Sequence, residues 1–148
     1  MKKTNNKGFS LVELIVVVAI MAVLMVVIAP QMLKYVERTR IQRDNSAIAE
    51  IANAAKIAMA DETINGSVTA TVEIRTDAAG KITFKTTVPL EKELADIIGD
   101  TVQLQATAYK SAGHGIDVAK DTTTGEITIT GVDLKQPNDA TKNLVITY

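Results

Sequence analysis

Few residues of this 148-residue chain are suited to chemistry, and most of them lack partners in the sequence. His114 is the single histidine and there is no cysteine, so a loop imidazole is favoured over a zinc site. Asp117, Asp121 and Glu126 offer oxygen ligands for calcium, but their spacing lacks the EF-hand pattern. The sequence has no glycine-rich phosphate loop and no plausible catalytic triad. It therefore predicts a protein that is not an enzyme and has no cofactor and no metal site.

Glu13 differs from these residues because it lies at the start of a long apolar run. The run Phe9–Ala29 spans 21 residues, of which only Ser10 and Glu13 are polar. As a helix it would be about 31 Å long, which matches the hydrocarbon core of a membrane. An ionised carboxylate at the centre of such a helix costs about 2.5–3.5 kcal/mol, and less near the interface. We therefore expect Glu13 to be functional and to have a partner.

The partner of Glu13 is not another side chain of the run, because no basic residue lies between Gly8 and Lys34. If the chain were cut between Gly8 and Phe9, the amide of Phe9 would become an ammonium group four residues from Glu13. That ammonium group would pair with Glu13 either within one chain or between two chains. A further alternative is that Glu13 lies among lipid headgroups.

The stretch Lys7–Glu13, which reads KGFSLVE, resembles the class III signal of type IV pilins and pseudopilins when taken with the apolar run and Pro30. The resemblance covers roughly residues 1–40. It implies that a prepilin peptidase cuts after Gly8 and methylates the new amine of Phe9. It also implies that Glu13 meets the Phe9 amine of a neighbouring subunit when the chains assemble into a helical filament.

Pro30 lies late in the apolar run and removes one backbone donor, which costs about 3 kcal/mol in a regular helix. The resemblance implies a kink or a locally melted segment here, whereas the alternative is that Pro30 begins a separate helix. A secretory signal peptide is disfavoured, because its only candidate cleavage site, Val27–Ala29, is followed directly by Pro30. A plain single-pass anchor is the other alternative.

The spacing of apolar residues extends the helix well beyond the membrane run, so that one helix is predicted over 9–60. Arg40 and Asp44 interrupt its apolar stripe, which becomes continuous from Ala47 onward. We therefore expect the globular part to pack on Ala47–Met59, with residues 31–46 as a polar neck. The predicted domains are a leader over 1–8, an apolar helix over 9–30, an amphipathic continuation over 31–61 and a head over 62–148.

Four basic residues cluster on the polar neck, namely Lys34, Arg38, Arg40 and Arg43. Residues 45–148 carry 9 basic and 14 acidic residues, a net charge of −5. The cluster therefore has two interpretations. It is either a solvated face or a contact with lipid phosphates, or it pairs with the acidic head of another subunit. The acidic head is also a poor electrostatic match for a nucleic acid, so no nucleic-acid partner is predicted.

The head has the pattern of an antiparallel sheet with one short helix. Alternation predicts a strand over 68–75, a hairpin over 67–88 and a strand over 102–108. Pro89 opens a predicted helix that Gly99 ends, and Asn65-Gly66 marks the end of the long helix. Two strands flank the turn 121–125, and a last strand covers 144–148. The fold class is α+β, with a long helix packed on a β-sheet head, as the resemblance to pilins implies.

The resemblance implies a structural subunit, and the favoured reading is the precursor of a major pilin. The rival readings are a pseudopilin of a type II secretion or competence system and, in another class, a membrane-anchored monomeric binding protein. The expected partners are further copies of the chain, a prepilin peptidase, the membrane and the pilus assembly machinery. The precursor is expected in the inner or cytoplasmic membrane with a single span, and the assembled pilus outside the cell, where it would serve adhesion and motility.

Overall fold

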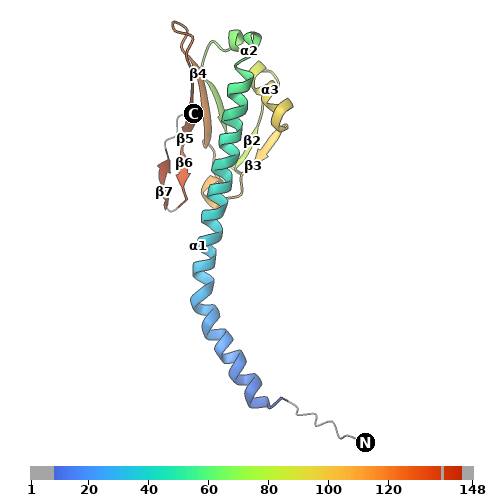
Figure 1. Cartoon of the computed structure of the whole chain (residues 1–148), viewed down its shortest axis with the longest axis vertical. Coiled ribbons are helices and arrows are strands. Elements are labelled where there is room, and N and C mark those ends of the chain that lie inside the picture. Colours follow the sequence, from blue (N-terminus) through green and yellow to red (C-terminus); the bar gives the residue numbers. More distant parts are fainter. Residues whose placement is uncertain (1–8, 138, 145–148) are drawn as a thin grey trace, which may run out of the picture. The chain divides into compact units, whose positions relative to one another are not determined.

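The computed structural model describes residues 9–137 and 139–144 of the chain (Figure 1). The long helix α1 covers Leu11–Ala58, which confirms the predicted helix to within two residues at each end. Pro30 lies inside α1, so the alternative that it begins a separate helix is wrong. The chain divides into two compact units, one up to Val36 and one from Glu37 onward, and α1 contributes to both. The two units are described separately.

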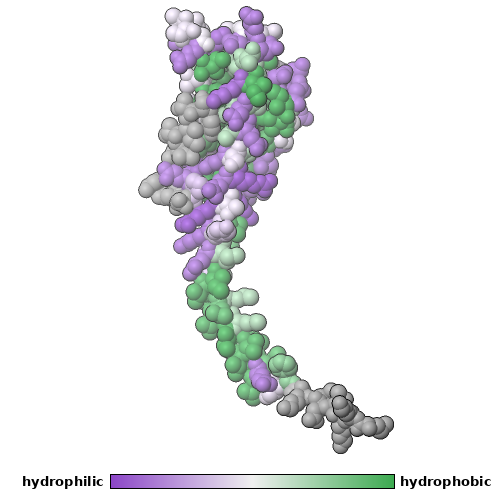
Figure 2. Space-filling view, viewed as in Figure 1, coloured by the Kyte–Doolittle hydropathy of each residue, from purple (hydrophilic) through white to green (hydrophobic). Residues whose placement is uncertain are grey.

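The first unit consists of the amino-terminal half of α1, whose apolar side chains are exposed from Phe9 to Val36 (green in Figure 2). Phe9 itself is 89% exposed. By length and composition α1 is able to cross a membrane, and its most apolar window of 18 residues has a mean hydropathy of 3.2. No residue of that window is buried by the parts of the chain that the structure describes.

The second unit places the other half of α1 against several short elements. These are α2 (Glu62–Ser67), β1 (Val72–Arg75), β2 (Lys81–Thr83), α3 (Pro89–Ile98), β3 (Thr101–Gln103), a 3₁₀ turn η1 (Thr107–Tyr109), β4 (Gly115–Lys120), β5 (Ile127–Val132), β6 (Leu134–Gln136) and β7 (Asp139–Leu144). The strands form one sheet in the order β1-β4-β5 and two pairs, β2-β3 and β6-β7. All of these pairings are antiparallel. The predicted α+β class, with a long helix on an antiparallel sheet, is therefore confirmed.

The predicted hairpin over 67–88 is wrong. β1 pairs with β4, with Val72 opposite Val118, and β2 pairs with β3, with Ile82 opposite Val102. The two halves of the expected hairpin are joined by an isolated bridge between Thr76 and Ile82 and by a hydrogen bond of 2.8 Å from the Asp77 N–H to the Lys81 carbonyl. The hairpin of β4 and β5 around the turn 121–125 is confirmed. Of the expected last strand, residues 145–148 lie outside the described residues.

Two helix boundaries had been predicted from local sequence signals, and one of them is confirmed. α3 begins at Pro89 and ends at Ile98, with Gly99 as its cap at φ 108°, as predicted. Asn65-Gly66, in contrast, lies inside α2 and does not end the long helix. The Asp61 side chain accepts hydrogen bonds from the backbone N–H groups of Thr63 and Ile64, which starts α2 directly after α1.

The core of the second unit begins earlier along α1 than expected. Ile41 is 1% exposed and Asp44 is 2% exposed, so the predicted polar neck over 31–46 is wrong from Ile41 onward. Ile48 and Ile51 continue the same buried face, which packs in one cluster with residues of the sheet. Gly115, at the start of β4, allows close packing of β1, because a Cβ there would lie 2.0 Å from the carbonyl oxygen of Ile74.

Candidate functional site

The carboxylate of Glu13 is bound to the start of its own helix. Because α1 begins at Leu11, Ser10 is the residue that caps it and Glu13 is the third helical residue. The backbone N–H of Ser10 donates a hydrogen bond of 2.8 Å to Oε2 of Glu13. This is the Glu half of a capping box, which satisfies a backbone donor that the helix leaves free. The spacing Ser-x-x-Glu was present in the sequence and would have predicted this contact.

This contact gives Glu13 a partner within its own chain that is not an ammonium group. A negative charge near a helix amino terminus is favourable because of the helix dipole. The bond uses a single oxygen and lies at an exposed position. Gly8, the residue on the other side of the expected cut, lies outside the described residues, so the pairing of Glu13 with a Phe9 amine stays a prediction.

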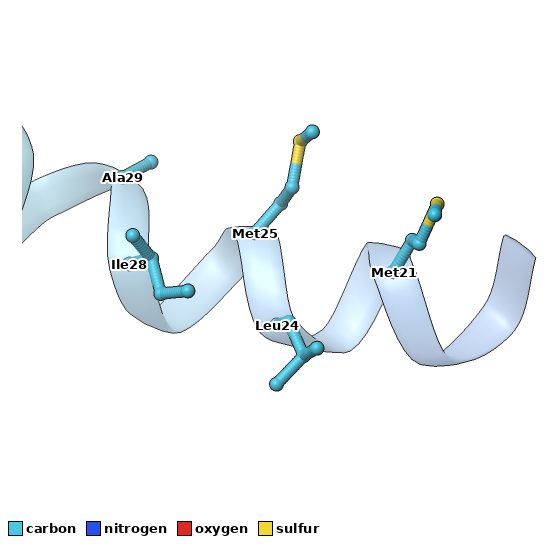
Figure 3. A pocket seen from close by; sticks show the side chains of 5 residues that line it. All are labelled: Met21, Leu24, Met25, Ile28 and Ala29. Atoms are coloured by element: carbon cyan, nitrogen blue, oxygen red, sulfur yellow. The ribbon is translucent and has the colours of Figure 1, made fainter. Parts of the chain in front are cut away.

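The surface that follows Glu13 along α1 is shaped like a helix-packing surface. A shallow apolar groove is lined by Met21, Leu24, Met25, Ile28 and Ala29. In Figure 3, Met21 and Met25 point to one side of the helix and Leu24 points to the other. Residues four apart form ridges on a helix, and the groove between two ridges receives a ridge of another helix. A second groove of the same kind is lined by Ala19, Ile20, Val23 and Leu24.

The basic cluster faces outward, whereas the two nearby acidic residues of α1, Glu37 and Asp44, bond to the segment before η1. Lys34, Arg38, Arg40 and Arg43 are all exposed. Within the part of the chain that the structure describes, Arg40 alone of the four forms an ion pair, which joins its Nη1 to Oε2 of Glu37 at 3.8 Å. The exposed surface of this stretch is therefore basic.

The carboxylates of Glu37 and Asp44 on α1 accept hydrogen bonds from the segment that leads into η1. Oε1 of Glu37 accepts a hydrogen bond of 2.5 Å from the backbone N–H of Thr107. Oδ2 of Asp44 accepts from the N–H groups of Gln105 and Ala106, at 2.8 and 2.6 Å. The predicted strand over 102–108 ends early because these backbone donors bond to α1 and not to a neighbouring strand.

Asp44 has an unusual electrostatic position because it is buried and has no ion-pair partner in the described residues. Loss of water raises the pKa of the Asp44 carboxyl above its ordinary value of 3.8, although the hydrogen bonds from Ala106 and Gln105 oppose the shift. The next residue, Asn45, is part of a closed ring of hydrogen bonds. Its Oδ1 accepts from the Tyr109 hydroxyl, its Nδ2 donates to the Lys135 carbonyl, and the Lys135 N–H donates to the Tyr109 oxygen.

His114 lies in the loop before β4, as predicted, and its side chain is buried. Its exposed fraction is 2%, and its ring packs edge-on against the ring of Tyr109 at 5.1 Å between centroids. Its Nδ1 lies 2.8 Å from the carbonyl oxygen of Asp133 and 3.0 Å from Oδ2 of the same residue. Its Nε2 lies 2.7 Å from the Ser111 hydroxyl. No local sequence pattern predicts this grouping, because Asp133 lies 19 residues from His114 along the chain.

Two of the three carboxylates that were considered for calcium, Asp117 and Asp121, have other partners. Asp117 pairs with the guanidinium of Arg75. Asp121 accepts hydrogen bonds from the N–H groups of Thr123 and Thr124, which form the turn between β4 and β5. These bonds lower the pKa of the Asp121 carboxyl. Among the described residues no group of three or more histidine and acidic side chains is arranged to hold a metal ion.

The comparisons with known proteins agree with the fold and with the start of the chain. Residues 3–29 match the model of the prokaryotic N-terminal methylation motif. Two relatives, each described as a fimbrial protein of Pseudomonas aeruginosa, are 32% identical over 117 residues, which cover 75% of this chain and 73% of the relative. A prepilin peptidase-dependent protein A of Clostridium perfringens is 35% identical over 68 residues, covering 46% of this chain and 49% of the relative. No solved structure matches.

A single apolar helix with a capped carboxylate near its start, joined to an antiparallel head, defines a pilin-like protein. The chain belongs to the type IV pilin-like family, as the length and identity of the match to the fimbrial proteins show. Proteins of this family are structural and not enzymatic. The methylation motif implies processing that depends on a prepilin peptidase.

Proposed function

We propose that the chain is the precursor of a major pilin, whose mature form polymerises into a type IV pilus filament. The observation that carries the proposal is the apolar amino-terminal half of α1, which has Glu13 near its start and is left exposed by the residues that the structure describes. Lipid would cover this surface in the membrane precursor, and the helices of sister subunits would cover it in the filament. The precursor would span the inner or cytoplasmic membrane once, and the filament would lie outside the cell, in adhesion or motility.

In this proposal the chain is cut between Gly8 and Phe9, and the new Phe9 amine is methylated. Glu13 then exchanges its hydrogen bond to the Ser10 N–H for the Phe9 amine of a neighbouring subunit. A carboxylate that enters an apolar filament core without a cation is heavily penalised, and a paired carboxylate is tolerated. The charge would therefore select the register in which a new subunit enters. Pro30 would allow α1 to bend or melt locally, because it lacks a backbone donor.

The remaining parts of the chain are assigned as follows. Residues 1–8 are the leader, 9–30 the membrane and filament-core helix, 31–61 its amphipathic continuation, and 62–148 the head. The exposed basic residues Lys34, Arg38, Arg40 and Arg43 would contact acidic surfaces of other subunits. Support comes from their outward position and from the net charge of −5 over 45–148.

Two substitutions separate the charge of Glu13 from its capping role. Glu13→Gln keeps an oxygen acceptor for the Ser10 N–H, because glutamine also completes a capping box, but it removes the charge. Glu13→Val removes both. We expect both variants to be cleaved and inserted into the membrane, and both to yield few sheared filaments. Glu62→Gln, an exposed acid in the first turn of α2, is the matched control and should assemble normally.

Electron microscopy and gel analysis of sheared surface fractions measure the assembly, and mass analysis of the mature chain identifies its first residue. If Glu13→Gln assembled like the wild type, capping would be sufficient and the role of the charge would be refuted. A mature chain that retained residues 1–8 would refute pilin processing altogether. Short filaments that never extend from the surface would assign the chain to the pseudopilins.

A further inference from the structure

A second feature, independent of assembly, lies in the head around His114. Ser111, His114 and Asp133 form a linear series of contacts, in which the imidazole lies between the hydroxyl and the carboxylate. Ser111 is exposed and His114 is buried directly behind it. Neither the family nor the proposed filament role requires an exposed hydroxyl to rest on a buried imidazole.

The contacts of His114 determine which ring nitrogen carries the proton in the neutral imidazole. Both groups close to Nδ1 belong to Asp133, and both are acceptors, namely a carbonyl oxygen and a carboxylate oxygen. Nδ1 must therefore be the donor, and Nε2 is left with a lone pair. The Ser111 hydroxyl, 2.7 Å away, then donates its proton toward Nε2. This is the arrangement by which an imidazole activates a serine hydroxyl.

Several contacts hold this arrangement in place. The Tyr109 ring packs against the imidazole, and Nζ of Lys135 binds Oδ1 of Asp133 at 2.7 Å. The Thr76 hydroxyl donates to the Ser111 carbonyl at 2.8 Å, and the His114 N–H donates to the Thr76 oxygen at 3.1 Å. The backbone segment between Ser111 and His114 is thus held at both of its ends by the same threonine. These contacts within the chain hold the hydroxyl beside the imidazole.

We propose that Ser111 is a nucleophilic modification site that accepts an acyl group from activated esters or thioesters. Ser111 Oγ attacks the acyl carbon while Nε2 of His114 takes the hydroxyl proton. The bond from the acyl carbon to the leaving oxygen or sulfur then breaks, and the leaving group departs with the proton from the imidazolium. The product is one ester at Ser111. The reaction is a single covalent modification and not turnover, so it is compatible with a structural protein.

Three other serines, which serve as internal controls for the reactivity of Ser111, occur in the chain at Ser10, Ser46 and Ser67. The hydroxyls of Ser46 and Ser67 donate to the backbone carbonyls of Gln42 and Ile64 and have no imidazole beside them. The full-length mature protein would be incubated with p-nitrophenyl acetate at neutral pH. Release of nitrophenol gives the rate and stoichiometry, and peptide mass analysis gives the acylated residue.

We expect one acetyl group per chain, located at Ser111 and absent from Ser111→Ala. His114→Gln should slow the acylation by about 100-fold, the lower range for loss of a positioned general base. Asp133→Asn should slow it as well, while its thermal melt shows whether the head remains folded. Equal acylation of Ser46, Ser67 and Ser111, or no serine ester at all, would overturn the proposal.

A second measurement leaves His114 unchanged, so its result does not depend on whether a His114 variant folds. Because the chain has no cysteine, Ser111→Cys and Ser67→Cys each create a single thiol in an otherwise unchanged head. Beside an imidazole the thiolate is favoured, so iodoacetamide should alkylate the Ser111→Cys variant at least about tenfold faster at neutral pH. Equal alkylation rates in the two variants would show that His114 does not activate position 111.

Discussion

The two halves of α1 differ in how hydropathy relates to burial. The first half contains the most apolar window of the chain, yet none of that window is buried. The second half carries Glu37, Asp44 and Asn45, yet Ile41 and Ile48 beside them are almost fully buried. Burial within one helix therefore follows the partners that its own chain provides. An apolar surface that its chain leaves uncovered is available to lipid or to another subunit.

Each half of α1 also contains one notable carboxylate, and Glu13 in the first half is exposed whereas Asp44 in the second half is buried. Glu13 accepts one backbone N–H at an exposed position. Asp44 accepts two backbone N–H groups at a buried position, and loss of water raises its pKa. Each carboxylate is matched to backbone donors, but only Asp44 has already been desolvated in the single chain. Glu13 would be desolvated only on assembly, as proposed above.

The largest expected effect is a difference in head stability between equivalent substitutions in the two halves of α1. Ile48→Ala removes a fully buried side chain and should destabilise the head by about 2–5 kcal/mol. Ile20→Ala removes a side chain that is 55% exposed in the first half, and should change head stability by less than about 0.5 kcal/mol. Thermal unfolding of the full chain in detergent measures both. A similar loss in the two variants would mean that the first half also packs within its own chain.

A smaller effect is expected from Asp44. Asp44→Ala leaves the N–H groups of Gln105 and Ala106 without their acceptor, and should cost about 1–3 kcal/mol. Asp44→Asn should cost less, because both bonds go to one oxygen, which an amide can supply.

The pH dependence of these variants has a definite sign. The pKa of Asp44 is raised in the folded state, so the unfolded chain loses this proton first as the pH rises. In the wild type, the contribution of Asp44 to the free energy of unfolding is fully present below the ordinary pKa of 3.8. It falls as the pH rises through the raised pKa of the folded state. Asp44→Asn should lack this fall. The difference between the two unfolding curves across that range measures it, and a constant difference would contradict the shift.

The smallest effect on the stability of the head is expected from substitutions in the basic cluster. Their effect on the filament is expected to be larger. Arg43→Ala should leave the thermal melt within about 0.5 kcal/mol of the wild type, because the side chain is exposed. It should nevertheless make filaments more sensitive to salt, since exposed charge pairs are screened. Lys92→Ala, an exposed basic residue of α3, is the control. Filaments of the wild type that survive high salt unchanged would instead favour lipid phosphates as the partners.

The sequence predicted those parts of the fold that depend on local signals. α3 was predicted to the residue, because proline at its first position and glycine at its cap act within one turn. The pairing of Val72 with Val118 was not predicted, because alternation identifies a strand but not its neighbour. Asp44 misled the prediction of the core, since its partners are backbone groups some sixty residues away that carry no mark in the sequence.

The functional residues also fall into two groups, those that local sequence patterns identify and those that only the tertiary fold brings together. The apolar run and Glu13 were found from composition alone, and the capping contact with Ser10 was available from its spacing. The grouping of Ser111 with His114 and Asp133 depends on how the chain enters β4 and leaves β5, which no local pattern specifies.

The hydrogen-bonded ring of Asn45, Tyr109 and Lys135 has a consequence for how the head is made. It joins α1, η1 and β6 across long stretches of chain, which is the task of a disulfide in many small exported domains. Its bonds form without an oxidant and are not broken by thiols. The head can therefore fold, unfold and refold identically in reducing and oxidising surroundings, with no isomerase needed to sort cysteine pairs.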